Sequence, residues 1–556
     1  MENLVVRNCR KTCTCNYAAQ SSIPGKKYLD SFTTCIAPDF VDYEGDNPGF
    51  YLIAREVISM NPNILLITVD QMRFDHLGLK GVKGIRTPNL DRLGREGIHF
   101  DRAYTSSPLC TPARLSLLTG QYPSVHGGYS IGVTVDPFPD RTLPRFLGEA
   151  GYRTALFGKT HFVARADEIT HFAGLENPPL EYFRNHTGPY AGFDQVRMST
   201  NHNINGRPSA HYGVWLEEQG LDYSNWFPDV RGRHDHGQTG TWNIPLEYHD
   251  STWTTNCTLD FISQNKDKRW FCWTSYNDPH EPFVCPEPWF SSVDTAAMEL
   301  FEDYRPGEFD DKPSFYNIAY QTGGWPKQMK HQMMGVPCAS TRKDLNGKER
   351  EALQATLGMV AMLDNEVGRI LQTLEQNGQM DNTLVIFTTD HGEIHKHHGF
   401  WHKGLFAYED CQRIPFLAWG PGVVRRQGSI NALVNLVDLP RTFVDLAEIP
   451  VPQGMQGVSL LPLLTGKSSQ IQDATMVELQ ATKNICQQTL ITKHHKLVVY
   501  RDQDYGELYD LQYDPDQYIN LWSIPQAASL KAELMHRFVQ FNMKKEGHVH
   551  DRRAFA

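Results

Sequence analysis

Two carboxylates stand at the ends of apolar runs, and each has a second possible ligand beside it. Asp70 ends the first long apolar run and is followed by Gln71, whereas Asp390 ends a later run and is followed by His391. Such runs are typical of buried parallel strands, and ligands collect at the carboxyl edge of the sheet they form. Two carboxylates, an amide oxygen and an imidazole indicate a site for one divalent cation, with Mn²⁺ or Ca²⁺ favoured and Mg²⁺ as the alternative.

A cysteine lies where a helix is predicted to begin. Pro112 suits the first turn after Cys110, three leucines supply an apolar face, and Gly120 ends the pattern. A nucleophile at a helix N-terminus faces unpaired backbone N–H groups and the positive end of the helix dipole, which favour an anionic group. Arg114, one turn on, can reach the same end. The alternative is a buried, inert cysteine.

The order of these motifs resembles that of the sulfatase family, within the alkaline phosphatase superfamily. The stretch PLCTPAR around Cys110, with its trailing Leu-Thr-Gly, resembles the signature Cys-x-Pro-x-Arg, and the strands that end at Asp70 and at Asp390-His391-Gly392 resemble the two metal motifs. The resemblance covers roughly residues 62–521. It implies that a formylglycine-generating enzyme converts Cys110 to formylglycine, whose hydrated aldehyde is the nucleophile and also a metal ligand.

The same resemblance implies roles for five further side chains. Arg114 would neutralise a diol oxygen of the modified cysteine. In the stretch GKTH, Lys159 would hold the formylglycine hydroxyl and a sulfate oxygen, and His161 would act as the base. In the stretch DPHEPF, His280 would protonate the leaving group, and Lys403 matches the last sulfate-binding lysine of the family.

The metal motifs depart from the usual family pattern. Most sulfatases carry a second Asp where this chain has Gln71, and often Asn where it has His391. This pair looks more like the phosphonate monoester hydrolases and the choline-sulfatase-like members of the superfamily. Thr111, and Lys159 with His161, look sulfatase-like instead, because phosphonate hydrolases tend to have Gly after the cysteine and hydroxyls at the other two positions.

The predicted function is therefore a sulfatase that hydrolyses sulfate monoesters, as an arylsulfatase does, through a covalent sulfo-enzyme. The first alternative is a phosphonate monoester or phosphodiester hydrolase that uses the same site. A non-catalytic binding protein, in a host that leaves Cys110 unmodified, is the alternative from another class. Trp and Tyr in an irregular insertion at about residues 163–250 could stack on the aryl or sugar part of the ester.

Apolar runs and helical spacings alternate along most of the chain. The sequence predicts buried strands at 64–69, 151–157, 270–273 and 383–387. Leucines and valines recur at helical spacing between Arg350 and Gln376, and Gly378 ends that pattern. This alternation predicts an α/β fold whose large, mostly parallel sheet is sandwiched by helices, as in alkaline phosphatase-like enzymes.

Four segments follow from the texture of the sequence. We expect an N-terminal extension at residues 1–60, a catalytic α/β domain at 61–470, a small C-terminal α+β subdomain with an antiparallel sheet at 471–541, and a tail at 542–556. Subunit contacts through the extension and the tail would make a homodimer or homotetramer. The histidines between positions 395 and 402 are predicted to lie on a solvated loop at the rim of the site.

Composition excludes some classes of partner. The 556-residue chain has a formal net charge of −11, which argues against nucleic acid, because a phosphate-binding face needs clustered Lys and Arg. No apolar run is long enough for a membrane span, and no signal-peptide core follows the first residues. Eleven cysteines form no regular disulfide pattern, so a cytoplasmic location is expected.

Overall fold

The chain divides into two compact units, residues 1–56 and 57–556, of which only the second contributes described residues. The computed structural model describes residues 61–135, 141–175, 178–200, 208–222, 225–227, 239–301, 304–322, 345, 347–481 and 485–545. The predicted N-terminal extension therefore lies outside the described residues, as do residues 546–556 of the predicted tail.

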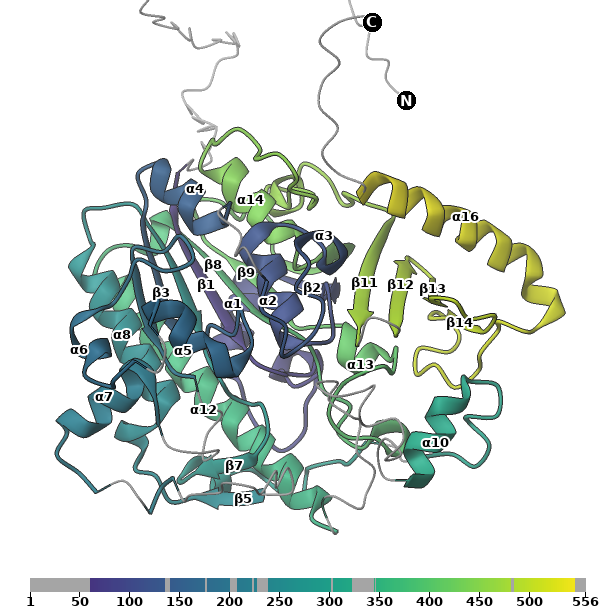
Figure 1. Cartoon of the computed structure of the whole chain (residues 1–556), viewed down its shortest axis with the longest axis horizontal. Coiled ribbons are helices and arrows are strands. Elements are labelled where there is room, and N and C mark those ends of the chain that lie inside the picture. Colours follow the sequence, from purple (N-terminus) through teal and green to yellow (C-terminus); the bar gives the residue numbers. More distant parts are fainter. Residues whose placement is uncertain are drawn as a thin grey trace, which may run out of the picture. The chain divides into compact units, whose positions relative to one another are not determined.

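An eight-stranded sheet forms the centre of the second unit, in the order β10-β2-β9-β8-β1-β6-β3-β4 (Figure 1). All neighbouring pairs are parallel except those that β9 makes with β2 and β8. The predicted mostly parallel sheet is confirmed, and all four predicted strands belong to it. The bounds are β1 (Asn63–Val69), β2 (Ile98–Tyr104), β3 (Arg153–Gly158), β4 (Gln195–Met198), β6 (Trp270–Ser275), β8 (Thr383–Thr389), β9 (Phe416–Trp419) and β10 (Gly428–Asn435).

Helices cover both faces of this sheet, which is why its central strands β1 and β8 are buried along their whole length. Along β1, Ile64 and Leu66 pack into one core cluster, whereas Leu65, Ile67 and Val69 pack into the other. The first cluster includes residues of α2, α4 and α14, and the second includes residues of α1, α8 and α12. Their bounds are α1 (Pro88–Glu96), α2 (Cys110–Thr119), α4 (Leu143–Glu149), α8 (Asp250–Gln264), α12 (Glu349–Gln376) and α14 (Asp438–Leu446).

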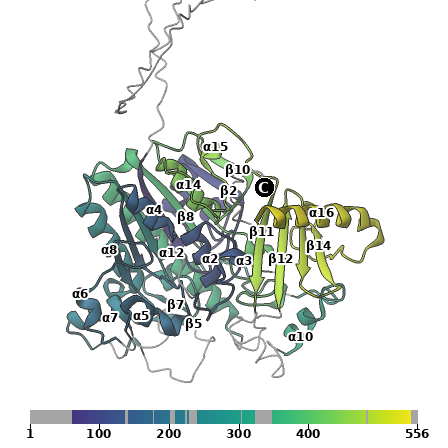
Figure 2. The ribbon, with the colours of Figure 1, turned by 45° about the horizontal axis from the view of Figure 1, so that its top comes forward.

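A second sheet follows in the C-terminal part of the chain, and it is antiparallel as expected. Its order is β11-β12-β13-β14, and α16 packs on it through Leu534, which shares a core cluster with Met476, Leu490, Leu497 and Leu508 (Figure 2). The predicted domain boundary at residue 471 stays a prediction. The bounds are β11 (Ala474–Gln480), β12 (Cys486–Thr492), β13 (His495–Tyr500), β14 (Gly506–Asp510) and α16 (Ala528–Lys545).

Shorter elements connect these layers, and several lie in the stretch predicted as an irregular insertion. Among the described residues, no helix combines the length and apolar character that a membrane span requires. The shorter elements are α3 (Pro123–His126), α5 (Arg165–Ala173), α6 (Tyr182–Asn185), α7 (Ala210–Glu218), β5 (Thr239–Trp242), β7 (Phe283–Pro286), α9 (Trp289–Ser292), α10 (Ser314–Thr322), α13 (Glu409–Gln412) and α15 (Leu461–Leu464).

Candidate functional site

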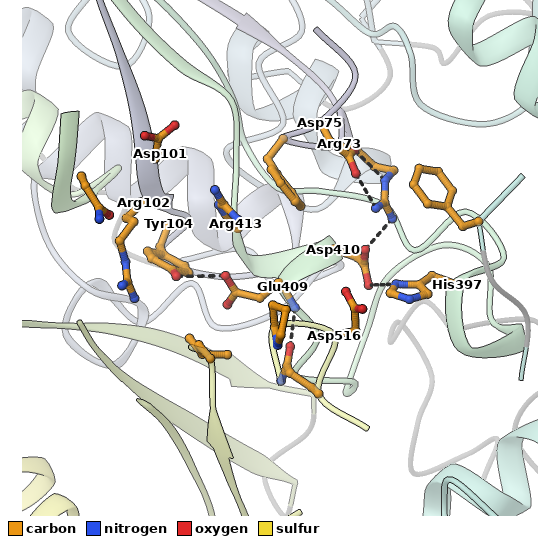
Figure 3. A pocket seen from close by; sticks show the side chains of 16 residues that line it. Arg73, Asp75, Asp101, Arg102, Tyr104, His397, Glu409, Asp410, Arg413 and Asp516 are labelled. Carbon is orange, nitrogen blue, oxygen red and sulfur yellow. Dashed lines mark hydrogen bonds and ion pairs between the residues drawn. The ribbon is translucent and has the colours of Figure 1, made fainter. Parts of the chain in front are cut away.

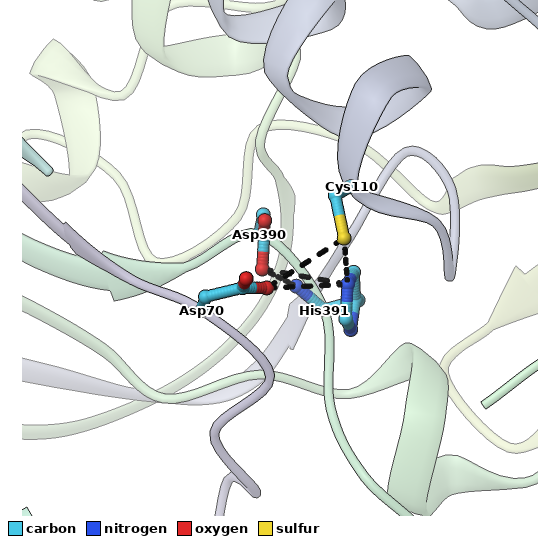
Figure 4. Close-up of side chains that lie close together, drawn as sticks. All are labelled: Asp70, Cys110, Asp390 and His391. Carbon is cyan, nitrogen blue, oxygen red and sulfur yellow. Dashed lines mark hydrogen bonds and ion pairs between the residues drawn. The ribbon is translucent and has the colours of Figure 1, made fainter. Parts of the chain in front are cut away.

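Four predicted ligands meet at the carboxyl edge of the central sheet. Asp70 follows β1 and Asp390 follows β8, and these strands pair up to Val69 and Thr389. Cys110 begins α2 and points towards both acids and His391 (Figure 4). One ligand atom from each of Asp70, Cys110, Asp390 and His391 lies within 4.8 Å of the others, and all four residues are buried.

The Cys110 thiol sits inside this cluster and is not ionised at neutral pH. Its Sγ lies 3.1 Å from His391 Nε2, 3.7 Å from Asp70 Oδ1 and 3.5 Å from Lys403 Nζ. Burial, and then the negative charge of Asp70, raises the pKa of the thiol to about 12. Because a cysteine attacks as its thiolate, unmodified Cys110 is poorly suited to nucleophilic attack.

His391 is held in the form that binds metals. Its Nδ1 donates to the backbone carbonyl of Gly392 at 3.0 Å, so the lone pair of Nε2 faces the cluster. Burial, and then the positive charge of Lys403, lowers the pKa of His391 to about 4, so the ring is neutral at neutral pH. Two buried carboxylates beside a neutral imidazole fit a divalent cation.

Arg114 contacts Asp390, and the predicted contact of Arg114 with the nucleophile's oxygen stays a prediction. Its Nε donates to Asp390 Oδ2 at 2.9 Å, and Nη1 donates to Ser275 Oγ at 2.7 Å and to the Lys159 carbonyl at 3.1 Å. Arg114 and Asp390 are both fully buried. The guanidinium therefore fixes the orientation of Asp390. Ser275, which no motif identified, ends β6 and holds the arginine from the other side.

Lys159 and His161 follow β3 in the loop that the GKTH stretch predicted. Lys159 Nζ forms an ion pair with Asp70, which brings a third cation to the cluster. His161 is buried and its backbone has a φ of 52°. The structure explains why the first residue of this motif is a glycine. A Cβ at Gly158 would lie 1.9 Å from the Ser275 carbonyl oxygen, and the backbone there has a φ of 96°.

Lys403 and His280 form a pair beside the thiol. Lys403 Nζ lies 2.9 Å from His280 Nε2 and also donates to Gln71 Oε1. His280 Nδ1 donates to the Glu281 carbonyl at 2.7 Å, so Nε2 accepts from the lysine. Burial lowers the pKa of His280 to about 3. The resemblance implied that His280 carries the proton for the leaving group. In this structure the proton shared by the two side chains lies on Lys403.

Two buried carboxylates next to Gln71 were not identified from the sequence. Gln71 Nε2 donates to Glu281 Oε2 at 2.6 Å and to Glu393 Oε2. Glu281 lies within the DPHEPF stretch and Glu393 lies two residues after His391, so both were visible inside motifs. Nothing in the sequence indicated that they converge on one amide, since they come from segments more than a hundred residues apart.

The prediction of a solvated histidine loop is wrong. His395, His397, His398 and His402 are all buried. Carboxylates contact two of these rings: His397 Nδ1 lies 2.9 Å from Asp410, 13 positions away, and His398 Nδ1 lies 3.1 Å from Glu308, 90 positions away.

One wall of a separate cavity is formed by Arg73, His397 and Asp410. Asp410 pairs with Arg73 at 2.6 Å and with His397, and Figure 3 shows this chain of ion pairs at one side of the cavity. The cavity has a volume of about 470 Å³ and is lined by residues of the eight-stranded sheet, such as Arg102 in β2, and by residues that follow β14, such as Leu511. The buried His397 is therefore part of a charged cavity wall, which the sequence did not reveal.

Left-handed backbone conformations gather around the cluster. Gln71 has a φ of 64°, and His395, Lys396, His398 and His402 have φ values between 52° and 77°. Residues other than glycine adopt this region at a cost, and they do so where the surrounding structure fixes a functional geometry. The segments after β1 and β8 are therefore shaped by the site they carry.

Comparison with known proteins gives a consistent assignment. A family model described as Sulfatase matches residues 62–449, and another, described as N-sulphoglucosamine sulphohydrolase, C-terminal, matches residues 396–544. An arylsulfatase of Clostridium perfringens is 28% identical over 470 residues, which are 83% of this chain and 90% of that protein. An N-acetylglucosamine-6-O-sulfatase of Bacteroides thetaiotaomicron is 24% identical over 541 residues, which are 90% and 92% of the two chains.

A solved structure shares the fold. The phosphonate monoester hydrolase of Agrobacterium radiobacter matches with a TM-score of 0.70 and 22% identity, over 87% of this chain and 96% of that one. At this identity the likeness concerns the fold alone. The Sulfatase model spans well over half of the sequence and contains every residue of the cluster. The chain belongs to the sulfatase family of the alkaline phosphatase superfamily.

Proposed function

We propose that the protein hydrolyses sulfate esters with a nucleophile made from Cys110 by conversion to formylglycine. The observation that carries this proposal is the position of Cys110 at the N-terminus of α2, with its Sγ within 4 Å of Asp70, His391 and Lys403. A thiol with a pKa of about 12 is poorly suited to act as a nucleophile. A hydrated aldehyde at the same place would supply an oxygen nucleophile.

We further propose that one divalent cation binds at this cluster, with Mn²⁺ or Ca²⁺ favoured and Mg²⁺ as the alternative. Asp70, Gln71, Asp390 and His391 would hold it together with modified Cys110. Such an ion lowers the pKa of an oxygen nucleophile and stabilises negative charge when it is bound. The neutral imidazole of His391 and the buried carboxylates support this assignment.

The charged side chains around the cluster support the remaining roles. A sulfate ester reacts slowly with water, so catalysis requires a fixed nucleophile and preorganised positive charge at the sulfuryl oxygens. Lys159 and Lys403 would supply that charge, since both ammonium groups point into the cluster. Lys403 and His280, joined at 2.9 Å, would deliver a proton to the leaving alcohol. His161 would take the proton whose removal releases sulfate.

The first prediction concerns the nucleophile. The tryptic peptide Ala103–Arg114, taken from protein made in its own host, should have a mass lowered by the thiol-to-aldehyde difference and should react with a hydrazine. Cys110→Ala should reduce aryl sulfate hydrolysis to background, because no other oxygen nucleophile is assigned. Cys486→Ala, in β12, is the matched control and should keep full activity. An unmodified Cys110 thiol in active protein would overturn the proposal.

A phosphonate monoester or phosphodiester hydrolase is the second candidate, and Gln71 favours it. An amide in place of a carboxylate lowers the negative charge at the cluster, which alters the charge of ester that the site accepts. Comparing kcat/KM for an aryl sulfate and an aryl phosphonate monoester separates the two functions. A higher value for the sulfate supports the first proposal, and a higher value for the phosphonate supports the second. A cytoplasmic location and a homodimer or homotetramer stay predictions from the sequence.

A further inference from the structure

Glu281 and Glu393 meet the same side-chain amide from two directions. Glu281 lies in the segment between β6 and β7, and Glu393 lies in the segment after β8. Both are buried, at 7% and 0% exposure, and ligand atoms of these residues and of His402 lie within 4.8 Å of one another. Two carboxylates so close together are costly to bury, so their arrangement needs a donor between them.

Gln71 supplies one such donor, next to the His402 ring that also faces both acids. Gln71 Nε2 donates to Glu281 Oε2 at 2.6 Å and to Glu393 Oε2, which uses both hydrogens of the amide. The other end of the amide, Oε1, accepts from Lys403 Nζ, which also lies 3.5 Å from Cys110 Sγ. Turning the amide over would place its oxygen against two carboxylate oxygens, so the two acids decide which end faces the cluster.

We propose that Glu281 and Glu393 are positioning residues that turn the amide oxygen of Gln71 towards the metal-binding cluster and exclude an acid from position 71. This inference rests on the proposed metal site. An Asp or Glu at position 71 would offer no hydrogen to the two acids and would add a third carboxylate beside them. The pair thereby limits the carboxylate ligands to Asp70 and Asp390, and it gives a physical reason for the glutamine in this chain.

The two acids differ in how tightly their geometry is set. Glu393 Oε1 accepts from the backbone N–H groups of His395, at 3.1 Å, and His402, so only Oε2 faces Gln71. In Glu393→Gln the amide oxygen must serve those two N–H groups, which leaves an NH₂ group facing the NH₂ group of Gln71. Gln71 then loses one of its two acceptors, and Glu281 alone holds the amide oxygen towards the cluster.

Glu281 tolerates the same change better. Its contacts with Gln71 and with His280 Nδ1, at 2.6 Å and 3.1 Å, fall on the single oxygen Oε2. In Glu281→Gln an amide oxygen can take the place of Oε2 and still accept from Gln71. The geometry therefore predicts a larger effect for Glu393→Gln than for Glu281→Gln, although both substitutions remove one negative charge.

The second prediction is measured as Mn²⁺ affinity, by calorimetric titration of the full chain after removal of bound metal. Glu393→Gln should weaken Mn²⁺ binding about 10- to 100-fold, which is the usual effect of losing a group that orients a metal ligand. Glu281→Gln should weaken it less than Glu393→Gln. Glu478→Gln is the matched control, because Glu478 is also buried and accepts from Ser124 and Lys545, which are not part of the cluster.

The outcomes separate this inference from the proposed function. If the Glu393→Gln variant binds Mn²⁺ as tightly as the wild-type protein, the inference is overturned and the proposed function is not. The same holds if the metal-free variant has a lower melting temperature but an unchanged Mn²⁺ affinity. Equal weakening in Glu281→Gln, Glu393→Gln and Glu478→Gln also overturns it, since that pattern reflects general destabilisation. A wild-type protein that binds no Mn²⁺ overturns both the proposed metal site and the inference. The peptide mass of Cys110 tests the nucleophile independently of all four results.

Discussion

A buried ion pair fixes one acid of the cluster. Arg114 and Asp390 are both fully buried, and the guanidinium also reaches Ser275 and the Lys159 carbonyl. Asp390 Oδ1 accepts from the backbone N–H groups of Gln71, at 3.2 Å, and His391, at 3.0 Å. These three contacts hold the Asp390 carboxylate in one orientation. Removing the arginine therefore leaves a buried negative charge without its partner.

The third prediction follows from that pair. Arg114→Met should lower the free energy of unfolding by about 3–5 kcal/mol, the usual cost of breaking a buried ion pair from one side. Urea unfolding in the presence of a chelator measures it without a contribution from metal binding. Arg92→Met is the control, because the Arg92–Glu96 pair on α1 is exposed and such pairs contribute roughly 0–1 kcal/mol. Equal stability of Arg114→Met and wild type would contradict the assigned role of Arg114.

One glutamate joins a helix to the C-terminal sheet. Glu507, in β14, accepts from the hydroxyls of Tyr316 in α10, Tyr500 in β13 and Tyr509 in β14. All four side chains are buried. Burial raises the pKa of Glu507, which the three hydroxyl donors oppose. These hydrogen bonds attach α10 to the sheet, and none of the four residues takes part in the proposed chemistry.

The fourth prediction concerns this attachment. Glu507→Ala leaves three buried hydroxyls without their acceptor, and each such group costs about 1–3 kcal/mol, so a loss of stability of about 3 kcal/mol or more is expected. Glu507→Gln keeps an acceptor oxygen and should lose less. Urea unfolding followed by tryptophan fluorescence measures both. Activity at 25 °C should persist in the folded variants, and a Glu507→Gln variant less stable than Glu507→Ala would contradict the argument.

Neutral histidines are buried in several parts of the molecule. Burial lowers the pKa of His126 to about 3, and that of His76, His211 and His398 to about 4. His126 Nδ1 accepts from the Gly128 N–H at 3.1 Å, which requires the unprotonated nitrogen. In the unfolded chain these four histidines take up protons below pH 6.5, whereas in the folded chain they do so only at about pH 3 to 4.

The fifth prediction is that these buried neutral histidines contribute less stability in acid. Because each of them binds more protons in the unfolded state between pH 6.5 and its folded pKa, its contribution to stability falls as the pH falls, by up to about 1.4 kcal/mol per pH unit for each such histidine. His126→Asn keeps an acceptor for Gly128 and should reduce that slope between pH 6 and pH 4. Unfolding free energies at constant metal concentration measure it, with exposed His536→Asn as the control. An unchanged slope in His126→Asn would refute the assignment.

The sequence by itself predicted the main elements of the sheet and the residues that gather at its carboxyl edge. Apolar runs that end in Asp70 and Asp390 were sufficient to predict two parallel strands and a shared edge, because the side-chain pattern of a strand is local and parallel strands align their carboxyl ends. Pro112 and Gly120 likewise marked the helix that begins at Cys110. The motif order then identified the family, which the comparisons confirmed.

Only the tertiary structure decided which groups contact one another inside that site. Arg114 pairs with Asp390 across 276 positions, and Gln71 contacts Glu281 and Glu393 across 210 and 322 positions. His398 likewise has a partner from a distant segment, since its Nδ1 lies 3.1 Å from Glu308, 90 positions away. A local pattern states what a residue offers, but its partner depends on how distant segments pack, and packing is a property of the whole chain.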